Sequence, residues 1–190
     1  SWLTRPSDLA FGWAGLAVHA SDRGRASAEV FELAGGALPL RVGVPKGQKS
    51  GTDNVSEAIE AMRKDVALLQ VVALPMGAFR ADGSWEPAAR DESDQEMFKL
   101  FARYHRLWFA PWISCPSVEA IRPEGLESLI RTVDADGVIL WFGSAWPDET
   151  ARSALKESLR SSALRVLLAG ESPDGREILL ETAGRGDEFT

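Results

Sequence analysis

The sequence predicts an α/β domain built around a parallel sheet, and three observations lead to this fold class. Short apolar runs alternate along the chain with amphipathic stretches, which is the pattern of repeated strand-helix units. The 190 residues are 45% hydrophobic and 26% charged, which is typical of one globular domain, here residues 1–190. No proline-rich, glycine-rich or charged stretch is long enough to separate two domains.

The strands are expected at the apolar runs, and we predict about six of them. Their spacing alone is compatible with either a closed barrel or an open, doubly wound sheet. The stretch 77–91, "GAFRADGSWEPAARD", is expected to be the longest connection between elements. The predicted strands are residues 9–19, 40–44, 67–74, 107–114, 138–142 and 164–169.

The helices are expected between these runs, where apolar residues recur at helical spacing. Ser93 with Glu96 is a capping-box pattern, Pro123 suits a first helical turn, and Asp148 suits the cap of a helix ending near Leu159. The predicted buried faces are Val55, Ile59, Met62 and Val66; Met97, Phe101, Tyr104 and Trp108; and Leu126, Leu129, Ile130 and Val133.

Composition limits the classes of partner. Lys and Arg total 21 against 28 Asp and Glu, and the resulting net charge of −7 disfavours a nucleic-acid partner. The single cysteine and two histidines form neither an internal disulfide nor an ordinary zinc site, so we expect a cytoplasmic protein without a metal. No apolar run reaches the length of a membrane span and no signal peptide is apparent, so no membrane partner is expected.

The segment "GVPKGQKSG" contains lysine in a glycine-rich loop between a predicted strand and a predicted helix. Backbone N–H groups in this context bind phosphate in many proteins. A nucleotide-binding P-loop, however, requires contiguous Gly-Lys-Ser/Thr, and here Gln48 separates Gly47 from Lys49. The segment is therefore not predicted to bind a nucleoside triphosphate.

Several motifs, in order along the chain, resemble the aldo-keto reductases. "HASDRGRASAEVFELAGG" resembles the family's turn and Gly-Arg-Ser-Glu helix start, and "LRVGVPKG" its third strand ending in Thr-Lys-x-Gly. "WFAPWISCPSVEAIRPEGLESLI" and "DADGVILWFGSAW" are similar to its fifth and sixth strands. Across about residues 9–170 the resemblance implies a TIM-type (βα) barrel with NADP at its strand ends. Because the chain lacks the region that resembles the eighth strand, the implied barrel is incomplete.

The same resemblance implies a degraded catalytic set. Lys46 stands at the position of the family's catalytic lysine, but Arg23 replaces its tyrosine, and Val18 and His19 lie where its aspartate would be. The histidine expected at the fourth strand end is missing from "VVALP". An imidazole titrates near neutral pH and an arginine does not, so His19 is the candidate substitute acid beside Lys46.

The cofactor-binding residues implied by the resemblance are Ser114, Cys115 and Trp141, which would surround a nicotinamide ring. The predicted function is therefore an impaired or non-catalytic aldo-keto-reductase-like protein that binds a small molecule or a protein partner. One alternative is an active NADPH-dependent carbonyl oxidoreductase with another proton donor. Tyr104, the chain's one tyrosine, is assigned to the buried face of a helix and not to catalysis.

A carbohydrate-active barrel is the other alternative. Tryptophans near strand ends stack on sugar rings in many proteins, and Trp108, Trp112, Trp141 and Trp146 are the candidates. Glycoside hydrolysis further needs two facing carboxylates, for which the candidates are Glu86, Glu119 and Asp148. An incomplete barrel also has open strand edges, so we expect residues 177–182 to cover one, or the chain to form a homodimer.

Overall fold

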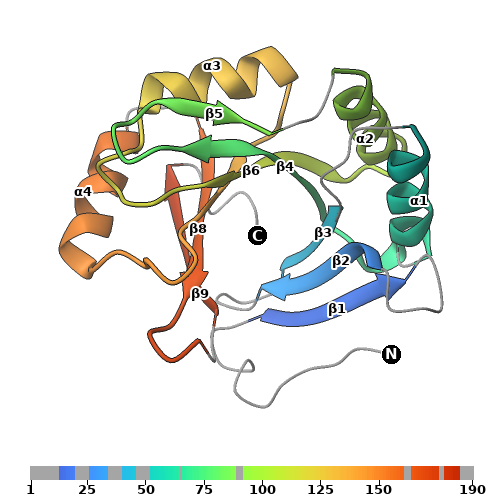
Figure 1. The fold of residues 1–190 in the computed structure, drawn as a ribbon, viewed down its shortest axis with the longest axis horizontal. Helices are drawn as coiled ribbons and strands as arrows, with labels where there is room; N and C mark the ends of the chain where they lie inside the picture. The colour runs from blue at the N-terminus through green and yellow to red at the C-terminus, as the bar shows by residue number, and fades with distance from the viewer. Residues whose placement is uncertain are drawn as a thin grey trace.

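The structure is a computed structural model that describes residues 13–19, 26–33, 40–45, 52–64, 66–88, 92–160, 164–175 and 178–184; for the first three segments only the backbone is described. Strands and helices alternate over most of this length (Figure 1). In chain order the elements are β1 (Trp13–His19), β2 (Ala26–Leu33), β3 (Leu40–Pro45), α1 (Thr52–Arg63), the 3₁₀ turn η2 (Val66–Leu68), β4 (Val71–Phe79), β5 (Trp85–Pro87), α2 (Glu92–Tyr104), β6 (Trp108–Ser114), α3 (Pro123–Val133), β7 (Val138–Trp141), α4 (Glu149–Leu159), β8 (Arg165–Glu171) and β9 (Ile178–Gly184).

The strands form one mixed sheet in the order β1-β2-β3-β4-β6-β7-β8-β9, with β5 paired to β4. The five strands from β3 to β8 on this path are parallel to one another. Antiparallel strands are added at both ends of this parallel centre, β1 and β2 on one side and β9 on the other. The predicted mostly parallel α/β sheet is thus confirmed, and the described residues contribute nine strands where six were predicted.

The described helices all pack on one face of the sheet. Along β6, Phe109 belongs to the core beneath α1 and α2, and Ile113 belongs to the core beneath α3 and α4. Side chains two or four positions apart on a strand share a face, so the two cores lie on the same side. Figure 1 shows the helices outside a curved sheet. A doubly wound sheet carries helices on both faces, so the described helices do not follow that alternative.

The opposite face of the sheet has small residues covered by indoles. Ala73, Ala110 and Ala169 are fully buried there together with larger apolar side chains. Trp108, Trp112 and Trp141 pack against this cluster and are each half-buried. Within the described residues, the terminal strands β1 and β9 are not paired with each other, so this part of the sheet is open.

Three strands were absent from the sequence prediction. The segment resembling Gly-Arg-Ser-Glu followed by a helix is the strand β2, held between β1 and β3, so the predicted helix there is wrong. The expected connection 77–91 contains β5, which forms a hairpin with β4. Ile178–Gly184 pairs with β8 as β9 and does not cross a gap, while residue 177 lies outside the described residues.

The helices mostly match their predictions. Pro123 begins α3, and the Asp148 side chain accepts a hydrogen bond from the Ala151 N–H as the cap of α4. Ser93 lies inside α2, which begins at Glu92, so it is not the cap. Tyr104 is 83% exposed, and its assignment to the buried face is wrong, because Phe98, Phe101 and Ala102 turn toward the core instead.

Among the helices described, none combines the length and apolar character needed to cross a membrane.

Candidate functional site

An open depression of about 310 Å³ lies where three parallel strands end. The carboxyl ends of β4, β6 and β7 meet at this edge because these strands run in the same direction. Ligands bind at this edge in parallel α/β folds, since the loops leaving the strands can be shaped independently of the sheet. The lining residues are Ala78, Phe79, Ser114, Cys115, Pro116, Trp141, Phe142 and Gly143.

Backbone hydrogen bonds fix the strand ends around the depression. The Cys115 N–H donates to the Trp141 carbonyl at 2.8 Å and links the end of β6 to β7. The Phe142 N–H donates to the Ala169 carbonyl at 2.8 Å, and the Glu171 N–H to the Gly143 carbonyl at 2.7 Å. The strand ends that form the wall are therefore linked to one another by backbone hydrogen bonds.

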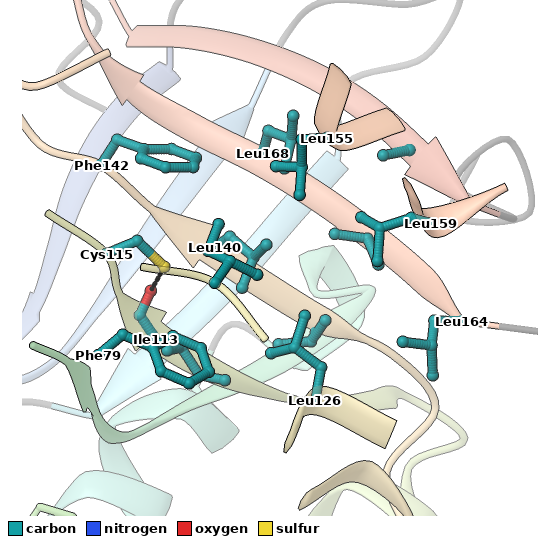
Figure 2. Packing of buried hydrophobic residues seen from close by; sticks show 14 of the residues in the cluster. Phe79, Ile113, Cys115, Leu126, Leu140, Phe142, Leu155, Leu159, Leu164 and Leu168 are labelled. Atoms are coloured by element: carbon teal, nitrogen blue, oxygen red, sulfur yellow. Dashed lines mark hydrogen bonds between the residues drawn. The ribbon is translucent and has the colours of Figure 1, made fainter. Parts of the chain in front are cut away.

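Ser114 and Cys115 point to opposite sides of the sheet although they are neighbours in the chain. The Ser114 side chain is exposed, whereas Cys115 is 4% exposed. The thiol packs with Phe79 and Ile113 and donates a weak hydrogen bond to the Ile113 carbonyl at 3.7 Å (Figure 2). Burial raises the pKa of the Cys115 thiol from 9.0 to about 12. The thiol is therefore protonated at neutral pH and is no nucleophile there.

Trp141 ends β7 and forms one side of the depression. Its ring packs against Trp112, with 5.2 Å between centroids and 32° between planes. Its Nε1 lies beside Gly143, 3.6 Å from the position that a Cβ at residue 143 would occupy. Gly143 has φ 56°, a left-handed conformation that suits glycine. The polar edge of the indole thus faces the glycine that follows the strand.

Of the predicted site residues, the structure brings Ser114, Cys115 and Trp141 together around this depression. His19 is the last residue of β1. Because β1 and β3 are both antiparallel to β2, they run in the same direction, and the backbone of His19 lies at the same edge of the sheet as the depression. Nothing is described of its side chain. Lys46 lies outside the described residues and follows Pro45, the last residue of β3.

The four candidate sugar-stacking tryptophans do not form one group. Trp108 is the first residue of β6, at the opposite end from the depression, with the Arg165 guanidinium 5.0 Å from its ring. Trp146 packs against Phe142 and against β8 at Gly170, where a Cβ would come within 2.7 Å of its ring. Of the four, Trp112 and Trp141 are the pair for which the described structure gives a ring contact near the depression.

The candidate carboxylates have other roles in the structure. Asp148 caps α4, and Glu86 is an exposed residue that pairs with Arg80 at 3.3 Å. Glu119 is exposed, and its carbonyl accepts a hydrogen bond from Arg122. None of the three lines the depression.

Charged side chains are absent from the described lining of the depression. In the part of the chain that the structure describes, no three His, Cys, Asp or Glu residues are grouped in a way that could hold a metal ion. Tyr104 ends α2, before the first residue of the seven-residue strand β6, so about 20 Å of strand separates it from the depression. The described surroundings of the depression are suited to binding and lack an acid-base pair.

Gly143 and Phe142 are lining residues that the sequence analysis did not select. Both are in the quoted segment "WFGSAW", and a glycine directly after an apolar strand is a signal for a special backbone conformation. No known protein family, curated protein or solved structure matches this chain.

Proposed function

We propose that this chain binds a small molecule at the strand-end depression and acts as a non-catalytic or strongly impaired relative of the aldo-keto reductases. One observation carries the proposal: Ser114, Cys115 and Trp141, the three residues that the resemblance assigns to a nicotinamide ring, line one depression. That depression lies at the edge of the sheet where parallel α/β proteins bind their ligands.

The chemistry of the lining favours binding over turnover. Carbonyl reduction needs a proton donor at the developing alkoxide, and such a donor typically contributes about 10²–10⁴-fold to the rate. The one tyrosine lies at the other end of β6, and the Cys115 thiol faces the helix-side core. Lys46 and His19 remain the residues predicted to support any remaining catalysis.

NADP fits this site only in part. The rings of Phe79, Trp141 and Phe142 offer apolar walls for a nicotinamide ring, and Ser114 offers a hydroxyl to its amide. No lysine or arginine is among the described lining residues to bind the phosphates. We therefore expect the chain to accept a ring-sized ligand more readily than an intact dinucleotide.

Purified protein mixed with NADPH and a panel of simple aldehydes tests the proposal. We expect no loss of NADPH absorbance above the enzyme-free control, and weak or no NADPH binding by calorimetry. Turnover that Lys46→Met abolishes would contradict the proposal and establish the active reductase. Turnover also lost in His19→Ala would identify the histidine as the acid.

Carbohydrate binding is the second candidate, favoured by the contact between Trp112 and Trp141 beside an exposed serine. Half-buried indoles with an adjacent hydroxyl are suited to a sugar ring. The described lining of the depression contains no pair of carboxylates that could hydrolyse a glycosidic bond. This candidate function is therefore sugar binding without hydrolysis. Calorimetry with a panel of neutral mono- and disaccharides distinguishes it from the first candidate.

The cellular location and the assembly state are part of the same proposal. A cytoplasmic location is proposed on the single cysteine, which burial keeps as a thiol. A homodimer is proposed on the edge of β9, which has a described partner on one side only, β8. Light scattering after size exclusion tests the assembly state, and a monomer across the accessible concentration range would contradict a dimer.

A further inference from the structure

A second cavity lies on the helix side of the sheet, between the β4–β5 hairpin and α3. Its volume is about 300 Å³. One wall contains the rings of Phe79 and Trp85, which are opposite each other in the hairpin, and the other wall is one side of α3. Figure 1 shows β5 beside α3. The residues of α3 that line the cavity are Gly125, Ser128, Leu129 and Thr132.

The hairpin places the Trp85 ring over β4. The rings of Trp85 and Phe79 meet edge to face, with 5.4 Å between centroids and 68° between planes. At Gly77, beside a bulge in β4, an added Cβ would lie 2.8 Å from Trp85 Cζ2 and 2.3 Å from the Glu86 carbonyl oxygen. A side chain at residue 77 would therefore displace the indole. Bulges often re-aim a side chain at functional sites, and here that side chain is a tryptophan that stays 36% exposed.

The turn of the hairpin lies against the start of α3. The Arg122 guanidinium donates to the Glu119 carbonyl at 2.8 Å, and its Nη2 lies 2.7 Å from the position of a Cβ added at Gly83. The Gly83 N–H donates to the Arg80 carbonyl at 2.9 Å, which closes the turn. The two walls of the cavity are thus in contact through the hairpin turn.

Gly125 enlarges the cavity although the described packing does not require a glycine there. It lies inside α3, where glycine is less favourable than alanine because it loses more conformational freedom on folding. A Cβ at residue 125 would lie 3.7 Å from the Arg122 Cβ and 4.0 Å from the Phe79 ring, which are ordinary van der Waals distances. The space that a side chain would occupy is therefore left in the cavity, beside the Phe79 ring.

The lining of the cavity favours an uncharged aromatic ligand. The described lining residues contribute two aromatic rings, a leucine and two hydroxyl groups, and no charged side chain that would compensate a buried charge. An apolar cavity of about 150 Å³ accepts one benzene ring. The volume of about 300 Å³ is therefore suited to a flat compound with two rings.

A small molecule fits this cavity better than a protein partner does. A protein interface needs several exposed apolar side chains at its centre. Of the large apolar side chains that the structure describes as exposed, Trp85 is the one that lines the cavity, whereas Leu100 and Tyr104 belong to α2. One exposed indole above a pocket provides a contact for a ring but not the centre of an interface.

From these observations we propose that the cavity is a second binding site, which takes an uncharged two-ring aromatic compound between the Trp85 ring and α3, in the space beside Gly125. This inference goes beyond the proposed function, which concerns the strand-end depression. Phe79 lines both the cavity and the depression, so the experiment has to follow each of them by its own signal.

Indole is the probe, and its titration is followed in ¹H–¹⁵N spectra of the intact, labelled chain. The seven tryptophans give indole N–H signals. The signal lost in Trp85→Phe reports on the cavity, and the signal lost in Trp141→Phe reports on the depression. We expect unlabelled indole to shift the Trp85 signal along a saturable curve. A Trp85 signal that does not move would overturn the inference, whether or not the Trp141 signal moves.

Gly125→Leu tests the space beside α3. Leucine fills part of the cavity and is the better helix former, so we expect indole to bind at least about tenfold more weakly while the thermal midpoint stays at or above that of wild type. Gly125→Ala makes the same change with one methyl group, and should raise the midpoint by about 1–4 °C and weaken binding less. Glu124→Leu is the matched control, because residue 124 is exposed on the same turn and does not line the cavity.

Trp85→Leu tests the ring contact. Leucine keeps an apolar side chain but no aromatic face, and the loss of one aromatic pair weakens binding by about two- to tenfold. Calorimetry with indole measures the affinity of each variant. Wild-type affinity in Gly125→Leu or in Trp85→Leu would overturn the inference, and so would an equal loss in Glu124→Leu. These results leave the proposed function untouched, since the NADPH and saccharide titrations test the depression separately.

Discussion

The two edges of the parallel sheet use their polar groups differently. At the amino edge, Arg103 pairs with Asp136 at 2.6 Å, and the same carboxylate accepts the Phe109 N–H at 2.8 Å. Arg165 lies over the Trp108 ring and donates to the Asp136 carbonyl at 3.4 Å. These bonds join the chain before β6, the chain before β7 and the first residue of β8. The amino edge is thus a network of mutual contacts.

At the carboxyl edge, Ser114 and Trp141 leave a hydroxyl and an indole N–H without a described partner inside the chain. The backbone there is fixed by sheet hydrogen bonds, so order does not require these side chains. Polar groups that stabilise a fold bind one another, whereas polar groups that bind a ligand are left available. The comparison therefore predicts stability effects for the amino-edge network and, at the carboxyl edge, binding effects for Ser114 and Trp141.

The largest effect is expected for the reactivity of Cys115, which tests whether the carboxyl edge is as well packed as described. Because burial raises the pKa of the thiol from 9.0 to about 12, its thiolate fraction near pH 8 is about 10³-fold below that of an ordinary cysteine. Ellman's reagent should label the native chain slowly and the urea-unfolded chain at once. Fast labelling of the native chain would show that the helix-side core opens at this edge.

At the amino edge, Asp136→Ala removes the acceptor of Arg103 and of the Phe109 N–H. Hydrogen bonds to a charged group contribute about 1.5–3 kcal/mol, and the half-buried carboxylate should give about 2 kcal/mol of lost unfolding free energy. Urea denaturation measures it. Asp136→Asn retains an acceptor for the Phe109 N–H and should lose less. If Asp136→Ala lost less unfolding free energy than Asp136→Asn, the result would contradict a stabilising role for this network.

The antiparallel end of the sheet adds a pH-dependent contact. Burial would raise the pKa of Glu181, but hydrogen bonds from Lys156 and Arg152 on α4 outweigh it and hold the pKa below its ordinary 4.5. The ionised form is thus favoured by folding, and the stabilisation is present above about pH 4.5 and lost as pH falls through the lower folded value. The stability gap between wild type and Glu181→Gln should narrow as pH falls.

Glu157→Gln is the control for this comparison. Glu157 pairs with Arg160 at 3.3 Å on the exposed surface of the same helix, where an ion pair contributes little. Its stability difference from wild type should stay near zero at each pH. If the stability difference between wild type and Glu181→Gln widened as the pH fell, the Glu181 carboxylate would not be stabilised by Lys156 and Arg152.

Sequence patterns predicted the parallel centre because buried strands need continuous apolar runs, as in "VVAL" and "VIL". β2 was missed because its alanines and glutamates are compatible with a helix, and pairing with β1 and β3 decides its conformation. β5 depends on a bulge in β4, where Gly77 with φ 150° has the Glu86 carbonyl 2.3 Å from any added Cβ. β9 was predictable, since "SPDG" between two apolar runs is a hairpin signal.

The candidate site was predictable to the extent that it follows strand ends. Ser114 and Trp141 close apolar runs, and the common direction of β6 and β7 brings such residues to one edge. The role of Gly143 depends on how close the indole lies, a tertiary distance that a single sequence does not contain. Tyr104 was placed on the wrong side because it lies three positions after Phe101, but six positions, or about 120° around the helix, from Phe98, which is fully buried.

The smallest stability effect is expected for Ser114→Ala, and it decides whether the two edges really differ. The side chain is exposed and its hydroxyl has no described partner, so the unfolding free energy should change by less than about 0.5 kcal/mol. Asp148→Ala, at the same edge, removes the cap of α4 and should cost about 1 kcal/mol. A loss for Ser114→Ala as large as that of Asp148→Ala would mean that the serine stabilises the fold. It would then no longer be a group left available to a ligand.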